Sequence, residues 1–155
     1  LALGLGEGSE HVMNQPPRKK DTSVLTKKDW VRIVEYALLI AITVFSVFFL
    51  SIKWLSLEQT QAVTISFLTL AFARLWHVFN MRDKKSNLIS NEITRNKFIW
   101  GAFGICIILL LSSVYLPFLS TVLSIQNPGM IGWILIIAFS FVPTIIIQIS
   151  HIFSS

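Results

Sequence analysis

The sequence predicts an all-α membrane protein, a bundle of four transmembrane helices preceded by an extended cytoplasmic segment. The chain of 155 residues is 54% hydrophobic and has a mean hydropathy of +0.68. A soluble domain of this size has too little interior to bury so much apolar surface, which makes lipid the expected solvent for much of it. Apolar stretches approach the ~20 residues that a helix needs to cross ~30 Å of hydrocarbon. They cover about residues 32–54, 60–80, 98–117 and 131–150.

The basic residues indicate which ends of these helices face the cytoplasm. Lys and Arg gather before the first stretch and in the connection 81–97, whereas the connection 118–130 has none and the first link has only Lys53. Lys and Arg are retained on the cytoplasmic side during insertion. The N-terminus, the 81–97 loop and the C-terminus are therefore expected in the cytoplasm. This distribution also accounts for the net charge of +5, and with no nucleic-acid-reading motif present we expect no nucleic-acid partner.

The chain divides into an extended segment, residues 1–30, and a transmembrane domain, residues 31–151. Gln15-Pro16-Pro17 favours extended backbone. Position 1 is Leu, and no signal peptide precedes the first apolar stretch, so we expect the C-terminal part of something longer. Tyr36 and Trp54 suit the two membrane interfaces. The short link 56–59 then forces an antiparallel hairpin between the first two spans.

Turn and helix-breaking residues delimit the last two spans. Pro117 ends the third, and Asn127-Pro128-Gly129 is a strong turn signal before the fourth. Pro143 should kink the fourth span by removing a backbone hydrogen bond. Gly101 and Gly104 are expected to permit close helix packing.

The second span carries small and polar side chains on one stripe, at spacings of three and four. Such a stripe suits either close helix–helix contact or a polar cavity along an ion path. In the packing interpretation, each hydroxyl bonds to its own backbone. The stripe comprises Ala62, Ser66, Thr69, Ala73, His77 and Asn80.

Arg74 lies on the same span, about 80° around the helix from this stripe at ~100° per residue. A charge within a span is costly and is a functional hypothesis in its own right. Because Arg74 is close to the cytoplasmic end, its side chain has two possible roles. It either reaches the lipid headgroups or an ion-pair partner, or it borders a transport path.

The sequence offers no residues for catalysis. It has no nucleophile–base pair and no paired carboxylates, and the glycine-rich residues 4–8 lack the strand and helix that a phosphate loop needs. Cys106 is the single cysteine and is expected to behave as a small apolar residue. We therefore predict no catalytic, cofactor-binding or metal-binding residues. Arg74, Ser66, Thr69, His77 and Asn80 are the candidates for an ion path or for helix packing.

Several short motifs, in this order, resemble the C-terminal membrane region of P-type cation-transporting ATPases, their transmembrane helices seven to ten. These are Leu1-Ala2-Leu3-Gly4, then Met13-Asn14-Gln15-Pro16-Pro17-Arg18, then Phe79-Asn80 followed by a loop rich in serine and basic residues. The last feature is similar to the bacterial calcium-pump-like branch. Gln15 stands where the family usually has arginine.

The resemblance implies a pump that forms an aspartyl-phosphate and moves a cation, with ATP and Mg²⁺ bound by upstream domains. Its partners would be the lipid bilayer, the upstream ion-binding helices, the phosphorylation domain and the transported cation. The expected location is a bacterial plasma membrane. This chain would brace the ion-binding helices and would hydrolyse no ATP alone. In calcium pumps the eighth helix supplies a carboxylate or amide to an ion site, and Arg74 falls near that position, which puts a second calcium site in doubt.

Two other interpretations stay open. The chain would be a stand-alone four-helix accessory or scaffold protein if a start codon lay close to Leu1. A small independent transporter would need internal repeats or matching broken helices, and only the fourth span has an interior proline.

Overall fold

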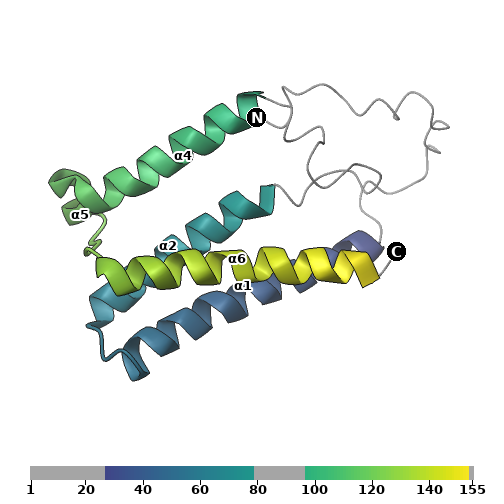
Figure 1. Cartoon of the computed structure of the whole chain (residues 1–155), viewed down its shortest axis with the longest axis horizontal. Coiled ribbons are helices and arrows are strands. Elements are labelled where there is room, and N and C mark those ends of the chain that lie inside the picture. Colours follow the sequence, from purple (N-terminus) through teal and green to yellow (C-terminus); the bar gives the residue numbers. More distant parts are fainter. Residues whose placement is uncertain (1–26, 79–96, 154–155) are drawn as a thin grey trace.

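The computed structural model describes residues 27–78 and 97–153, and all of its regular structure there is helical. Most of the expected extended segment, the loop 81–96 and Asn80 lie outside the described residues. Figure 1 shows the elements, which are α1 (Lys27–Lys53), α2 (Gln59–His77), α4 (Lys97–Tyr115), α5 (Pro117–Val122) and α6 (Gly129–Phe153). The all-α prediction is therefore confirmed.

The first helix includes charged residues that precede its apolar stretch. α1 starts at Lys27, so its first four residues overlap the range 1–30 that the sequence analysis gave to the extended segment. Lys has good helix propensity. A helix can therefore begin before its apolar stretch, and the apolar stretch alone places its first residue too late.

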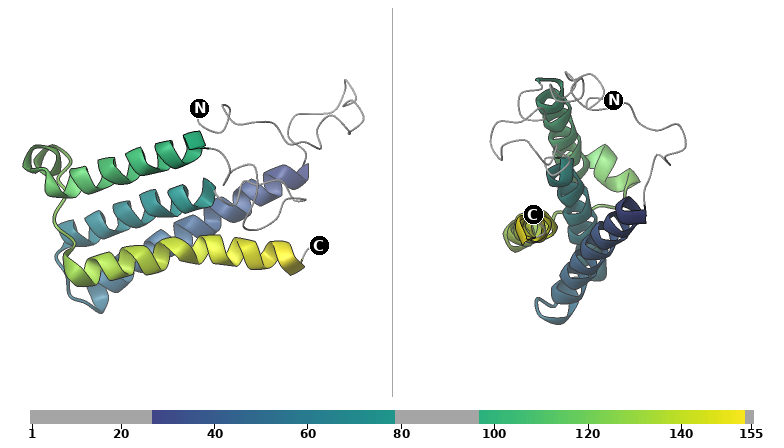
Figure 2. Two further views of the ribbon diagram at one scale, coloured as in Figure 1. Left: turned by 45° about the horizontal axis from the view of Figure 1, so that its top comes forward. Right: turned by 90° about the vertical axis from the view of Figure 1, so that its right-hand side faces the viewer.

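α2 is the central helix of the bundle. It packs against α1, α6 and, less extensively, α4. In Figures 1 and 2 it lies between α1 and α4, with α6 crossing the α1–α2 pair. The core cluster draws buried side chains from four helices, namely Val47, Ile65, Leu68, Phe72, Val114 and Ile136.

The helices are not equally apolar. Three are long and apolar enough to cross a membrane, over Trp30–Lys53, Lys97–Tyr115 and Gly129–Ile149. α2 is helical over almost the whole range 60–80 expected for the second span, but it is not among these three helices. The helix with the most polar composition is thus the one surrounded by the others.

The connection between α4 and α6 contains a short helix that the sequence analysis did not predict. α4 ends at Tyr115, and Pro117 occupies the first turn of α5, where its missing N–H leaves no hydrogen bond unmade. The predicted turn before α6 is confirmed. Gly129 adopts a φ of +67° there, and its N–H donates to Asn127 Oδ1 at 3.0 Å. α6 continues through Pro143.

The glycines that permit close packing differ from those expected. A Cβ built on Gly101 or Gly104 would have no neighbour within 4 Å among the described residues, so the packing role predicted for them is wrong for the described helices. At Gly132 the same atom would lie 2.7 Å from Pro128 Cβ and 3.1 Å from Ile65 Cδ1. Gly132 is therefore where α6 approaches α2 most closely among the described glycines.

Candidate functional site on the central helix

The predicted stripe of small and polar residues on α2 lies largely in the interior. Ala62, Thr69 and Ala73 are buried, and Ser66 is half-buried. The Ser66 hydroxyl donates to the Ala62 carbonyl at 2.9 Å, and the Thr69 hydroxyl to the Ile65 carbonyl at 2.7 Å. Both hydroxyls thus bond to their own helix, as a packing surface requires.

His77 closes the stripe at the last residue of α2. Its ring meets Tyr36 of α1 edge-on, with centroids 5.2 Å apart and an interplanar angle of 77°. His77 Nδ1 is buried and has no hydrogen-bond partner among the described residues. The structure therefore places His77 with Tyr36 at the end of the α1–α2 contact.

Arg74 lies on a different surface of α2. Its side chain is exposed, and at ~100° per residue it shares a face with Val63, Phe67 and Leu70. Val63 is 52% exposed and Phe67 45% exposed, and Leu70 is half-exposed. We call these four residues the uncovered face of α2, because α1, α4 and α6 pack elsewhere on this helix. The structure brings Ser66 and Thr69 into the bundle and leaves Arg74 outside it.

The described residues contain no cluster of three or more His, Cys, Asp or Glu side chains that could hold a metal ion. Cys106 is half-buried and carries a free thiol. What the described side chains can do is pack, hydrogen-bond and present the charge of Arg74.

Sequence reasoning missed two polar residues that attach the start of α2 to the segment before α6. The Thr64 hydroxyl accepts from the Gln126 backbone N–H at 3.1 Å and donates to the Thr60 carbonyl at 3.0 Å. Gln61 Nε2 donates to the Asn127 carbonyl at 3.1 Å. Both residues lie on the side of α2 away from the predicted stripe, so the spacing rule did not select them.

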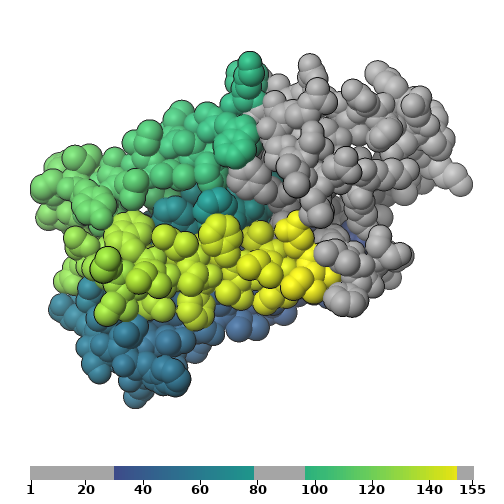
Figure 3. All heavy atoms as spheres, in the orientation of Figure 1, coloured from purple at the N-terminus to yellow at the C-terminus, as the bar shows by residue number. Residues whose placement is uncertain are grey.

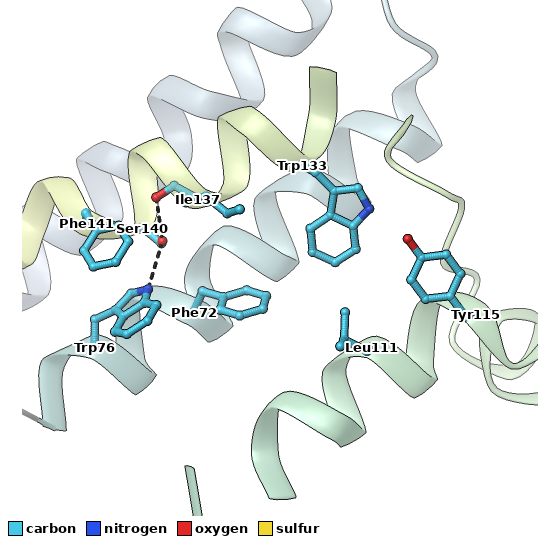
Figure 4. Close-up of a pocket in the computed structure, with 8 residues that line it drawn as sticks. All are labelled: Phe72, Trp76, Leu111, Tyr115, Trp133, Ile137, Ser140 and Phe141. Atoms are coloured by element: carbon cyan, nitrogen blue, oxygen red, sulfur yellow. Dashed lines mark hydrogen bonds between the residues drawn. The ribbon is translucent and has the colours of Figure 1, made fainter. Parts of the chain in front are cut away.

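Sequence reasoning also missed a polar contact in the middle of the bundle. The Trp76 indole N–H donates to the Ser140 hydroxyl at 3.2 Å, and that hydroxyl donates to the Ile137 carbonyl at 2.9 Å. Trp76 also stacks on Phe141, with centroids 4.4 Å apart. Figure 4 shows these residues beside an apolar opening that faces α4. The sequence signal for this contact is a tryptophan in the last turn of the second apolar span.

The family model described as "Cation transporting ATPase, C-terminus" matches residues 1–153. The chain is 30% identical, over 149 residues, to a protein named "Calcium-transporting ATPase" from Bacillus subtilis (strain 168). The match covers 95% of this chain but only 16% of that relative's length. The helical, largely apolar chain therefore belongs to the family of C-terminal membrane regions of P-type cation-transporting ATPases.

Proposed function

We propose that this chain is the C-terminal membrane domain of an ATP-driven cation pump and supports the pump's ion-binding helices. Calcium is the first candidate for the transported ion, because the Bacillus subtilis relative is named for it. ATP, Mg²⁺ and the phosphorylated residue would belong to the remainder of the pump. The transported cation and the upstream helices would be its functional partners, in a bacterial plasma membrane with both ends of this chain in the cytoplasm.

The observation that carries the proposal is the uncovered face of α2. α2 is the most extensively packed helix of the bundle, yet Val63, Phe67, Leu70 and Arg74 have no covering helix among the described residues. Arg74 lies in the last turn of α2, so the cost of its charge is below the about 2.5–3.5 kcal/mol given for the centre of a membrane-spanning helix. A surface with a guanidinium group and two large apolar side chains suits another protein segment better than hydrocarbon.

We infer that upstream transmembrane helices of the same pump cover this face. The match to 16% of the relative's length leaves most of a pump to supply them. In this arrangement α1, α4 and α6 pack on the rest of the surface of α2, and the upstream helices contact its uncovered face. The domain then transmits no chemistry of its own and fixes the position of the helices that bind the ion.

Arg74 would act there as a built-in positive charge beside the ion path. Two unit charges ~4 Å apart interact by about 4 kcal/mol at an effective dielectric constant of ~20. A fixed guanidinium group therefore disfavours a second divalent cation nearby and favours a carboxylate on the facing helix. Ser66, Thr69 and His77 would set the packing of α2, and Asn80 would lie at its exit.

The test uses the full-length pump with Arg74→Gln, Arg74→Lys and, as a matched control, Lys53→Gln. Lys53 is an exposed basic residue at the end of α1. Removal of the charge should tighten the apparent affinity for Ca²⁺ about tenfold, which corresponds to about 1.4 kcal/mol. Arg74→Lys and Lys53→Gln should leave this affinity unchanged. The readout is ATP hydrolysis as a function of Ca²⁺ concentration.

Two results would contradict parts of this proposal separately. An unchanged Ca²⁺ affinity in Arg74→Gln, together with a lower protein yield, would make Arg74 purely structural. Absence of any cation-stimulated ATP hydrolysis by the unmodified full-length protein would overturn the pump itself.

A further inference from the structure

A cleft of about 540 Å³ lies between α4 and the α2–α6 pair. Phe72 and Trp76 of α2 form its floor, and its walls include Leu111 and Tyr115 of α4 and Trp133 and Ile137 of α6. Figure 4 shows these side chains converging on one opening. In Figure 3, atoms of α2 are visible at the bottom of the gap between α4 and α6. This cleft is separate from the uncovered face of α2, which carries Arg74.

The mouth of the cleft opens where a bilayer would lie. Its two walls belong to α4 and α6, both of which are long and apolar enough to cross a membrane. Leu111 and Ile137 stand at the walls and are 37% and 53% exposed. A molecule that enters from the side therefore comes from the hydrocarbon phase.

The inner part of the cleft offers no hydrogen bond to a ligand. Its polar atoms are the Trp76 indole N–H and the Ser140 hydroxyl, and these bond to each other and to the Ile137 carbonyl. The remaining inner surface is aromatic or aliphatic. An apolar chain fits such a surface, because a polar group there would lose its hydrogen bonds to water without replacing them.

The end of the cleft near α5 has a different character. Tyr115 stacks on Trp133 there, with centroids 6.4 Å apart and an interplanar angle of 11°. Trp133 Nε1 is buried and has no hydrogen-bond partner among the described residues. The neighbouring short helix α5 exposes Phe118 and Val122. Amphipathic aromatic side chains gather at the level of lipid headgroups and glycerol esters.

We propose that the cleft binds one phospholipid, with an acyl chain between α4 and α6 and an ester carbonyl that accepts a hydrogen bond from Trp133. Because Trp133 Nε1 is buried and Tyr115 stacks on its ring, the Tyr115 side chain would have to move for the ester group to reach this N–H. The cavity volume falls within the ~300–1,000 Å³ typical of ligand sites. α4 packs on α2 much less extensively than α6 does. The lipid thus completes the contact between α4 and the rest of the bundle, whatever ion the pump carries.

The test compares phospholipid retained by the purified full-length protein and by a variant whose cleft is filled. Ile137→Trp places an indole in the cleft, and Ile131→Trp is the matched control on the opposite side of α6, where Ile131 is exposed and does not line the cleft. The probe is phosphatidylcholine in mixed detergent micelles, detected by native mass spectrometry. We expect the unmodified protein and Ile131→Trp to retain a bound lipid and Ile137→Trp to lose most of it.

A second variant keeps the test decisive if Ile137→Trp fails to fold. Trp133→Phe keeps an aromatic ring and removes the N–H, so lipid affinity should fall about fivefold, the loss of one hydrogen bond. The fall should be the same with phosphatidylglycerol, since both lipids carry the ester. Equal retention by the unmodified protein, Ile137→Trp and Trp133→Phe would overturn the lipid site. So would the absence of retained lipid in the unmodified protein, which would assign the cleft to another part of the pump.

Discussion

The indole N–H of Trp76 on α2 and the hydroxyl of Ser140 on α6 meet at 3.2 Å, in a bundle whose other described side-chain hydroxyl bonds are mostly within single helices. Ser140→Ala removes the acceptor and leaves the indole N–H without it. Side-chain hydrogen bonds in membrane bundles average about 0.6 kcal/mol, with a maximum of about 1.7. We expect a loss of stability in this range, measured by unfolding in mixed micelles. Ser46→Ala is the control, because Ser46 bonds only to the Ile42 carbonyl of its own helix. A loss no larger than that of the control would show that the contact contributes nothing to stability.

Gly132 sets the distance between α6 and α2. An alanine Cβ there would lie 3.1 Å from Ile65 Cδ1 of α2 and 2.7 Å from Pro128 Cβ, just before α6, so Gly132→Ala should destabilise the protein by the ~1–3 kcal/mol typical of overpacking. Gly104→Ala is the matched change in a membrane helix, and its Cβ meets no atom within 4 Å. That variant should be neutral or more stable by up to about 1 kcal/mol, because alanine favours the helix. Equal melting temperatures for the two variants would contradict the close approach at Gly132.

Thr64 supports the segment that leads into α6. Thr64→Val keeps the shape of the side chain and removes the acceptor of the Gln126 N–H, so we expect a loss of about 1 kcal/mol. Thr69→Val is the comparison, since the Thr69 hydroxyl bonds only within its helix, to the Ile65 carbonyl. The free energy of unfolding of the two variants distinguishes the link to Gln126 from a hydrogen bond within the helix. The inverse order of effects would show that burial, not the link to Gln126, determines the contribution of a threonine on α2.

α2 should cross the membrane although it is less apolar than its neighbours. α1 and α2 form a hairpin, and α4 and α6 follow each other along the chain through α5, so Glu58 and Gln126 should be on one side and Lys97 on the other. All three side chains are exposed. Single cysteines at these positions, in a background without other cysteines, can be labelled with a membrane-impermeant reagent. Labelling of positions 58 and 97 from the same side would show that α2 does not span.

The helices could be predicted closely from the sequence because a bilayer demands long apolar runs. The expected ranges 60–80 and 98–117 compare with Gln59–His77 and Lys97–Tyr115. α5 was missed because six residues beginning with proline have no period to detect. The charged first turn of α1 lies outside the apolar stretch, so hydropathy alone places the start of this helix too late.

Contacts between helices were much harder to predict. The sequence analysis assigned close packing to Gly101 and Gly104, but Gly132 makes the close approach, since a glycine's neighbours depend on how two helices cross. The hydroxyls of Ser66 and Thr69 on the stripe form intrahelical hydrogen bonds, as the packing interpretation describes. Its relation to an ion path remains a prediction. The Trp76–Ser140 pair joins residues from two spans, so no spacing within one span could reveal it.

The attachment of the start of α2 to the segment before α6 has a mechanical consequence. Gln61 and Thr64 hold Asn127 and Gln126, while α1 and α6 both pack along α2, so these three helices are braced at the α5 end and along their length. α4 joins this group through few contacts. In a pump whose helices shift against one another, these three helices would form the fixed part of the membrane domain. The ion-binding helices would then move relative to α2, and α4 would be the helix of this domain that is freest to move with them.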